Sequence, residues 1–249
     1  MISVIMGVNR FDEFVPLAVD SILGQTFKEF EFIIVANGSA RDEIEYKLLQ
    51  LYPLESRLKI YKSKIAQLSH ALNIGIENAA YDYVARMDAD DIAWPMRLEK
   101  QLAFMKGRNL EMVGCDIRLI DSMGVIVGNR VYPKGSNIDR WLSFKCCFAH
   151  NTVLIRRCVL LKARGYNSGF NTEDYDLWLR LRRNGIKWDN MEDVLLDYRL
   201  HQGASQRRLL GYAESTALAM REFVLKRSPT NFLAVIVHFL KSIFRVKRS

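Results

Sequence analysis

The sequence predicts an α/β fold, in which a mostly parallel, twisted sheet is covered by helices on both faces. Apolar runs of strand length alternate with segments of helical spacing up to about residue 116, which is the pattern of strand–helix–strand units joined by right-handed crossovers. The 249 residues are 49% hydrophobic and 26% charged, with only 5 prolines. The chain is therefore long and apolar enough to form a single globular domain without a structural metal or disulfide.

The first half of the chain alternates strands and helices in order. Residues 2–8 form an apolar run of strand length, and residues 12–23 then change to helical spacing. Pro95 suits the first position of a helix, because its missing N–H would have no partner there. The other predicted elements of this half are strands at 30–36, 58–61, 83–87 and 111–115 and helices at 42–51, 67–80 and 95–105.

The second half is less regular. No internal repeat or Pro/Gly-rich linker separates it from the first half, so it elaborates the same domain. Gly185 ends a clear helix that begins near Thr172. The predicted elements here are a hairpin arm at 125–131, a strand at 152–155, a helix at 172–183, an extended segment at 195–200 and helices at 213–227 and 229–244.

The cysteines and the N-terminus indicate a reducing compartment. The four cysteines contain no C-x-x-C pair, which disfavours a zinc site and a secreted disulfide framework. The first residues lack a basic leader and a small-residue cleavage site. The longest strongly apolar stretch, residues 232–240, is far shorter than the roughly 20 residues that cross a bilayer. We therefore expect a cytoplasmic protein that does not span the membrane.

The positive charge is concentrated at the C-terminus. The formal net charge is +8, and residues 203–249 alone contain nine Lys or Arg against two glutamates. A nearly neutral body with a basic tail favours an anionic surface as the partner of the tail. A nucleic-acid binder is disfavoured, because the body is not basic and no phosphate-loop or zinc-finger spacing occurs. No G-x-G-x-x-G opens the first helix, which disfavours a dinucleotide oxidoreductase.

Acidic side chains follow directly on the strand predicted at 83–87. In open α/β sheets, ligands bind beyond the carboxyl ends of the strands. If the chain stays extended, Asp88 and Asp90 face the same way and both can approach one divalent ion, with Mg²⁺ or Mn²⁺ suited to carboxylate oxygens and substrate phosphates. The alternative is an acidic turn before Pro95. Arg86 could pair with these acids or hold a phosphate, and Trp94 is a candidate for stacking on a ring.

A second acidic group opens the helix at 172–183. Thr172 is a candidate N-cap, and carboxylates at Glu173 and Asp174 are favoured there by the helix dipole alone. The functional alternative is a general base that faces the metal site, and spacing does not decide which carboxylate turns inward. His150 and His201 could be ligands, phosphate contacts or structural residues.

These segments together resemble the family 2 glycosyltransferases, which have the nucleotide-sugar-binding GT-A fold. The matches are collinear and cover roughly residues 2–205. They are SVIMGV (3–8), DSILGQTFKEFEFIIVANGS (20–39), ALNIGIENA (71–79), YVARMDADDIAWPMRLEKQ (83–101), HNTVLIRR (150–157), TEDYDLWLRL (172–181) and YRLH (198–201).

The resemblance implies roles for particular residues. Asp88 and Asp90 match the metal motif, with Asp88 near the ribose and Asp90 on a Mn²⁺ or Mg²⁺ ion that bridges the diphosphate. Asp174 matches the proposed catalytic base. Gly7 and Val8 match the loop that contacts the nucleoside, and Asn37 the contact with the base, while Arg86, His150 and His201 fall at recurrent positions of the family. Together with these matches, we expect Arg86 to contact the nucleotide, and Trp94, His150, Glu173 and His201 to contact acceptor or phosphate.

The implied activity is transfer of a hexose or N-acetylhexosamine from a nucleotide diphosphate sugar, expected to be a UDP-sugar. One base opposite the leaving group gives direct displacement with inversion. The implied acceptor is a lipid-linked saccharide in the synthesis of O-antigen, lipopolysaccharide or capsule. Two alternatives are a metal-dependent nucleotidyltransferase, which would release pyrophosphate, and a catalytically inactive sugar-nucleotide-binding scaffold.

The tail is predicted to attach the enzyme to a membrane. Residues 1–205 are expected to form the catalytic domain and residues 206–249 a basic amphipathic helical extension. An apolar stripe with basic residues at its end can lie in an anionic membrane surface, here the inner face of the cell membrane. The alternative is a helix packed on the domain or in a homo-oligomer. The stripe consists of Phe232, Ile236, Leu240, Ile243 and Phe244.

Overall fold

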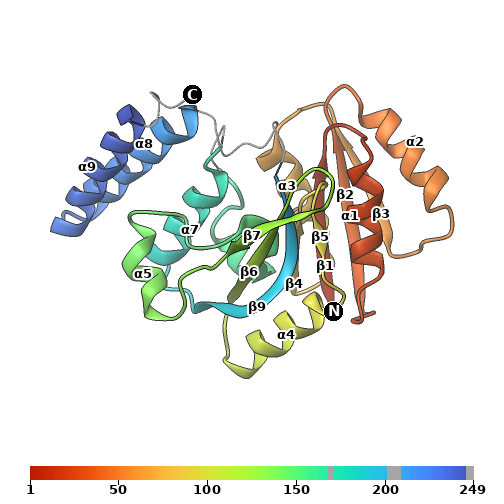
Figure 1. Cartoon of the computed structure of the whole chain (residues 1–249), viewed down its shortest axis with the longest axis horizontal. Helices are drawn as coiled ribbons and strands as arrows, with labels where there is room; N and C mark the ends of the chain where they lie inside the picture. Colours follow the sequence, from red (N-terminus) through yellow and green to blue (C-terminus); the bar gives the residue numbers. More distant parts are fainter. Residues whose placement is uncertain (168–170, 201–208, 245–249) are drawn as a thin grey trace.

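A computed structural model describes residues 1–167, 171–200 and 209–244, and its centre is one nine-stranded sheet (Figure 1). Four neighbouring strands, β3, β2, β1 and β4, run parallel, whereas β8 is antiparallel to both β4 and β6. The predicted α/β fold is confirmed, and the sheet is mixed beyond β4. The strands in spatial order are β3 (Leu58–Ser63), β2 (Phe30–Asn37), β1 (Ile2–Val8), β4 (Tyr83–Met87), β8 (Leu154–Arg156), β6 (Met112–Ile120), β9 (Trp188–Arg199) and β5 (Ile92–Ala93), with β7 (Ile126–Arg130) paired to β6.

Helices cover both faces of this sheet. Along the buried strand β1, Val4 and Met6 pack in the apolar cluster that includes α1 (Phe14–Leu23), α2 (Arg41–Leu51) and α4 (Arg97–Gly107). Ile5 packs in the opposite cluster, because successive side chains of a strand point to opposite faces. That cluster includes residues of α3 (Leu68–Asn78), α5 (Ser136–Leu142), α6 (Arg157–Lys162) and α7 (Glu173–Arg183).

The strand order reverses beside β1. The chain passes from β1 outward to β2 and β3, and then returns to place β4 on the other side of β1. Such a reversal opens a crevice at the carboxyl ends of the two strands. The acidic segment that begins at Asp88 follows β4 at this point.

Two predicted boundaries are wrong in an informative way. Helix α4 begins at Arg97, so Pro95 lies two residues before it rather than in its first position. The carbonyl oxygen of Pro95 accepts the backbone N–H of Thr26 at 2.8 Å, so the proline belongs to a turn tied to the loop after α1. The predicted strand at 111–115 extends to Ile120, because β6 pairs with β7 on one side and β9 on the other.

The last two described helices form a pair at one side of the molecule, beside α5 and α7 (Figure 1). Helix α9 (Pro229–Phe244) packs on α8 (Leu209–Leu225) and turns Asn231, Ala234 and His238 inward. All five residues of its predicted apolar stripe are exposed. Within the described ranges, none of the helices is both long and apolar enough to cross a bilayer.

Candidate active site

The acidic segment after β4 forms a turn rather than an extended strand. The strand-like alternation predicted for Asp88 and Asp90 is therefore wrong, yet their carboxylates still converge. Ligand oxygens of Asp88, Asp90 and Asp91 lie within 4.8 Å of one another. Three carboxylates at this separation repel each other unless a positive charge compensates them.

Asp91 is a structural member of this turn. It is only 1% exposed, and its Oδ1 accepts the backbone N–H of Arg199 at 2.8 Å, while its Oδ2 accepts the side-chain amide of Asn151. The guanidinium of Arg199 also donates to the carbonyl oxygen of Asp90 at 2.9 Å. Burial, followed by the charges of Asp88 and Asp90, raises the pKa of Asp91 well above its usual range. The end of β9 thus fixes the shape of the turn.

The donor set of the turn fits a divalent cation. Asp88 and Asp90 are partly exposed, while Asp91 uses both its oxygens within the protein. Partly exposed carboxylate oxygens beside an open cavity are the ligands that Mg²⁺ and Mn²⁺ prefer, with phosphates and water completing the shell. Asp88 and Asp90 would therefore hold the ion.

Arg86 is buried behind this turn. It is 2% exposed and forms an ion pair with Asp88. Burial disfavours its charge, but the interaction with Asp88 outweighs burial and raises the pKa of Arg86 above its usual range. The guanidinium Nε has no hydrogen-bond partner in the described part of the protein, so this group can still donate to an anion in the cavity.

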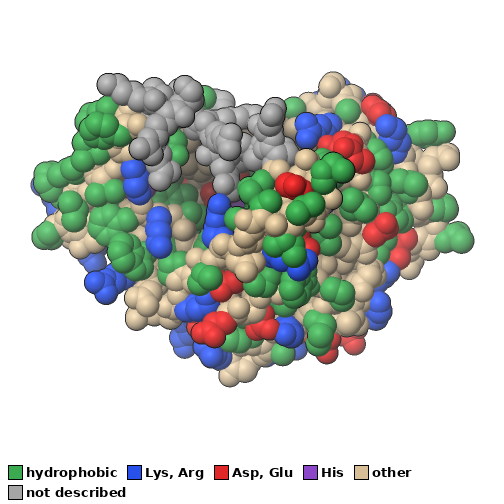
Figure 2. Space-filling view, in the orientation of Figure 1, with side chains coloured by type: hydrophobic (Ala, Val, Ile, Leu, Met, Phe, Trp, Pro, Cys, Tyr) green, Lys and Arg blue, Asp and Glu red, His purple; other side chains and the backbone are tan. Residues whose placement is uncertain are grey.

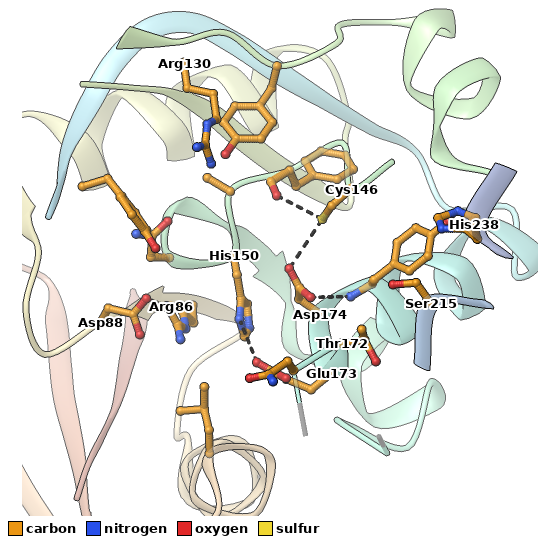
Figure 3. Close-up of a pocket in the computed structure, with 18 residues that line it drawn as sticks. Arg86, Asp88, Arg130, Cys146, His150, Thr172, Glu173, Asp174, Ser215 and His238 are labelled. Carbon is orange, nitrogen blue, oxygen red and sulfur yellow. Dashed lines mark hydrogen bonds and ion pairs between the residues drawn. The ribbon is translucent and has the colours of Figure 1, made fainter. Parts of the chain in front are cut away.

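A cavity of about 420 Å³ joins this turn to the start of α7. Figure 3 shows Asp88 and Arg86 on one side, Glu173, Asp174 and Cys146 on the other. The cavity is also lined by residues that the sequence did not single out: Leu68, Arg130, Tyr132, Cys146, Phe148, Ala149, Asn151, Asn171, Tyr175, Tyr198, Ser215 and His238. They come from loops, from the short helix η1 (His150–Thr152) and from α3, α7, α8, α9, β7 and β9. Asn151, Tyr175 and Tyr198 stand within the quoted segments 150–157, 172–181 and 198–201, but no role was assigned to them, and the others lie outside every quoted segment.

Asp174 is held at the cavity by two hydrogen bonds. Its Oδ1 accepts the backbone N–H of Tyr175 at 2.6 Å, and its Oδ2 lies 3.4 Å from the Cys146 Sγ, whose thiol can donate to it. Burial raises the pKa of Asp174, while these two donors and Arg86 partly oppose the shift. Asp174 therefore lines the cavity and is not separated from it by packed core. A base role requires this position.

Glu173 lies beside Asp174 in the same cavity. Burial, followed by the charge of Asp174, raises the pKa of Glu173 to about 7. Thr172 occupies the N-cap position, but its side chain does not cap the helix. Its hydroxyl donates to Glu214 of α8 at 2.9 Å instead, which ties the start of α7 to the C-terminal helices.

His150 lies largely buried between the two acidic groups, with 12% of its side chain exposed. Its Nε2 lies 2.9 Å from the Tyr166 hydroxyl, and its Nδ1 lies 3.8 Å from Glu173 Oε1. Burial, with a further contribution from Arg86, lowers the pKa of His150 well below its usual value. The ring is therefore neutral and serves as a hydrogen-bonding wall of the cavity.

The predicted nucleoside residues lie at the ends of β1 and β2, outside the lining of this cavity. A Cβ at Gly7 would lie 3.2 Å from the Leu68 side chain, so glycine lets α3 approach β1 closely, and Val8 is buried in the core. Asn37 donates to the carbonyl of Gln67 at 3.3 Å, while its buried Oδ1 has no partner among the described residues. That oxygen suits an N–H donor on a ligand.

Trp94, a predicted contact, is not among the residues that line this cavity. The Trp94 indole donates to Asp197 at 2.8 Å, and the Arg118 guanidinium covers its ring at 4.9 Å. Trp94 is thus engaged by β6 and β9 rather than available for stacking in this cavity. His201 lies outside the described residues.

Sequence comparisons match this chain to a known family. A family model described as Glycosyl transferase family 2 matches residues 3–165. The chain is 47% identical over 247 residues to the O-antigen biosynthesis glycosyltransferase WbnJ of Escherichia coli, covering 98% of this chain and 97% of the relative. It is 27% identical over 251 residues, covering 97% and 90%, to the E. coli UDP-Gal:alpha-D-GlcNAc-diphosphoundecaprenol beta-1,3-galactosyltransferase.

Solved structures share the fold. The complex of S. aureus TarS 1-349 with UDP-GlcNAc matches with a TM-score of 0.70 and 14% identity, over 97% of this chain and 81% of that one. The mannosyltransferase PcManGT from Pyrobaculum calidifontis, in complex with GDP-Man and Mn²⁺, matches with a TM-score of 0.68 and 14% identity, over 97% and 69%.

Proposed function

The chain belongs to glycosyl transferase family 2 and has the GT-A fold, and from that premise we propose that this glycosyltransferase moves a hexose or N-acetylhexosamine from a UDP-sugar to a hydroxyl of a lipid-linked saccharide, with inversion. One observation carries the proposal: Asp88 and Asp174 line the same cavity of about 420 Å³. A leaving diphosphate and an attacking hydroxyl need groups of opposite function at either end of the sugar.

The turn after β4 that holds Asp88, Asp90 and Asp91, called the acid turn below, is the proposed binding site of the donor diphosphate. Asp88 and Asp90 would hold Mn²⁺ or Mg²⁺, which supplies Lewis-acid neutralisation of the departing nucleoside diphosphate when bound. Arg86, with its unpartnered Nε, can donate to a phosphate oxygen from behind the turn. The unpartnered Oδ1 of Asn37 supports a contact with a nucleobase N–H, and Gly7 and Val8 stay predicted neighbours of the nucleoside.

Asp174 is the proposed base. It lies in hydrogen-bond reach of the cavity interior, and its raised pKa suits it to take the proton of an acceptor hydroxyl as that oxygen attacks the anomeric carbon. A single base on the side away from the leaving group supports direct displacement. An α-linked donor would then yield a β-glycoside.

The relatives support the substrate class. One relative is named for O-antigen biosynthesis, and another for transfer from UDP-Gal to a sugar diphosphoundecaprenol. By analogy, the proposed acceptor carries its saccharide on a polyprenyl diphosphate. Such an acceptor lies at the membrane surface, because its lipid is anchored in the bilayer.

The C-terminal extension, residues 206–249, is proposed to bring the catalytic domain of residues 1–205 to the inner face of the membrane. Figure 2 shows hydrophobic side chains gathered over the region of α8 and α9. On α9, Phe239 and Ile243 are among the exposed apolar residues, and the chain beyond it is basic. An amphipathic helix with these properties lies in the surface of an anionic bilayer.

Vesicle binding tests the membrane part. The double variant Phe239→Asn/Ile243→Asn should sediment far less than the wild type with vesicles that contain phosphatidylglycerol. Both side chains face solvent, so the fold is expected to persist. Equal sedimentation of variant and wild type would overturn membrane attachment through α9.

A donor screen tests the reaction itself. UDP- and GDP-sugars are incubated with Mn²⁺ and a lipid diphosphate saccharide, and the nucleotide product is identified. Release of a nucleoside diphosphate together with a glycosylated lipid supports the proposal. Release of pyrophosphate would identify a nucleotidyltransferase, and binding without turnover would identify an inactive scaffold.

A further inference from the structure

Arg130 is a cation of the cavity that forms no ion pair with an Asp or Glu among the described residues. It lies at the end of β7, and Arg86 is the other Lys or Arg side chain in the lining that the structure describes. Arg86 pairs with Asp88, whereas none of the ion pairs among described residues includes Arg130. Figure 3 shows the Arg130 side chain reaching toward the cavity from the strand above it.

Tyr132 places this charge on the Asp174 side of the cavity. Both side chains line the cavity, and the Arg130 guanidinium lies close enough to the Tyr132 hydroxyl oxygen to donate to it. Burial raises the pKa of Tyr132, the Arg130 guanidinium partly opposes that shift, and the nearby Cys146 and Asp174 add to it, so the phenol is a neutral donor close to the proposed base. Arg130 and Tyr132 thus form a pair of anion-binding donors apart from the acid turn, where the donor diphosphate is proposed to bind.

The hairpin that carries this pair is apolar on its outside. Strand β7 pairs with β6 alone among the described strands, and five large apolar side chains on or beside it face solvent. An exposed apolar edge strand marks an interaction surface. These residues are Met123 (85% exposed), Val125 (60%), Ile126 (57%), Val127 (52%) and Val131 (72%).

A ligand that is anionic inside the cavity and apolar beyond it satisfies both features. We propose that Arg130, assisted by Tyr132, binds the diphosphate of a lipid diphosphate-linked acceptor, whose lipid then leaves along the β7 hairpin. This inference rests on the proposed function and adds the residues that select the acceptor. A guanidinium can donate two parallel hydrogen bonds to phosphate oxygens, and a lysine ammonium cannot reproduce this geometry.

Two acceptors that differ in one group provide the test. They carry the same sugar, one on a short lipid diphosphate and the other on a neutral phenyl glycoside. Arg130→Ala should raise the acceptor KM for the diphosphate compound about 10- to 100-fold, as expected for losing hydrogen bonds to a charged group. The KM for the phenyl glycoside and the donor KM should not change, and Arg130→Lys should restore part of the loss. Arg140→Ala removes an exposed arginine outside the cavity lining and should change none of these values.

Other outcomes overturn the inference. Equal losses with both acceptors, in the Ala and the Lys variants alike, would show that Arg130 only supports the hairpin. A rise confined to the donor KM would assign Arg130 to the nucleotide diphosphate. If the wild-type enzyme transfers sugar to neither compound, the proposed acceptor class fails before Arg130 is tested, and this result is distinct from a variant effect.

Discussion

Two acidic groups face the same cavity, and their surroundings differ. At the turn after β4, Asp91 accepts two hydrogen bonds and Asp88 pairs with the buried Arg86. At the start of α7, no ion pair with Lys or Arg is formed by Glu173 or Asp174 within the described chain. Their partners are the Tyr175 N–H, the Cys146 thiol and the neutral His150.

The contrast explains how one residue type can serve two kinds of chemistry. At the turn after β4, Asp88 lies beside the Arg86 guanidinium, and both Asp88 and Asp90 are partly exposed, as ligands of a cation beside a cavity must be. At the start of α7, burial raises the pKa of Asp174 and raises that of Glu173 to about 7, and a raised pKa favours a carboxylate that takes up a proton. The environment, rather than the side chain, separates the ligand from the base.

The largest effect on activity is expected at the acid turn. Asp90→Asn removes a charged ligand, so turnover that depends on Mn²⁺ or Mg²⁺ should be abolished while circular dichroism and melting temperature stay near wild type. Asp193→Asn, which breaks a partly exposed pair with Lys100, is the matched control and should retain activity. Full activity in Asp90→Asn would remove the metal role from this turn.

The next largest effect on activity is expected at the start of α7. Asp174→Asn should lower kcat about 10²- to 10⁴-fold, the usual contribution of a general base, with donor KM near wild type. Steady-state kinetics with donor and acceptor varied separately measures both values. A loss confined to donor KM would count against the base and move Asp174 to the donor end.

The raised pKa of Glu173 predicts that the free energy of unfolding depends on pH. The folded pKa of about 7 exceeds the unfolded value, so the folded state holds the proton more tightly and loses stability as pH rises from about 4.5 to 7. Glu173→Gln cannot ionise. Its free energy of unfolding, relative to wild type, should therefore rise by roughly 3 kcal/mol across this range. Urea unfolding at several pH values measures the difference, and a constant offset would mean that Glu173 titrates normally.

The strand ends and the acidic segment were predictable because their signals are local. An apolar run followed by Asp88 is enough to place a carboxylate at the edge of a parallel sheet. The turn geometry was not predictable, because Asp91 is fixed by Asn151, 60 residues away, and by Arg199, 108 residues away. No periodicity within one segment carries that information.

Spacing also left open whether Glu173 or Asp174 is the base, because the contacts that distinguish them come from distant parts of the sequence. Both lie in the cavity, and only the loop that carries Cys146 gives Asp174 its second hydrogen bond. That loop lies between α5 and the short helix η1 (His150–Thr152), where the sequence shows neither strand nor helix spacing. Cys146 was missed because an isolated cysteine in such a segment has no motif, and Arg130 was missed because nothing within the predicted hairpin arm at 125–131 shows that its last residue faces a cavity.

Cys146 gives the smallest and most specific prediction. Its Sγ lies 3.4 Å from Asp174 Oδ2 and 3.4 Å from the Phe148 carbonyl oxygen, so its single proton has two acceptors. Donation to Asp174 is stronger when that carboxylate is ionised, which opposes the rise in its pKa caused by burial.

Cys146→Ala should therefore raise the pKa of Asp174 further and move the acid limb of the kcat–pH profile upward by about half a unit, as a net hydrogen bond of 0.5–1 kcal/mol would. Cys146→Ser keeps a donor and should retain the wild-type limb, and Cys158→Ala, at an exposed cysteine, serves as the control. If the Ala and Ser variants lose the same activity at every pH, the thiol only fills space. A shift in the Ala variant alone would show that the base end of the cavity is tuned by neutral hydrogen bonds, where the opposite end is tuned by charge.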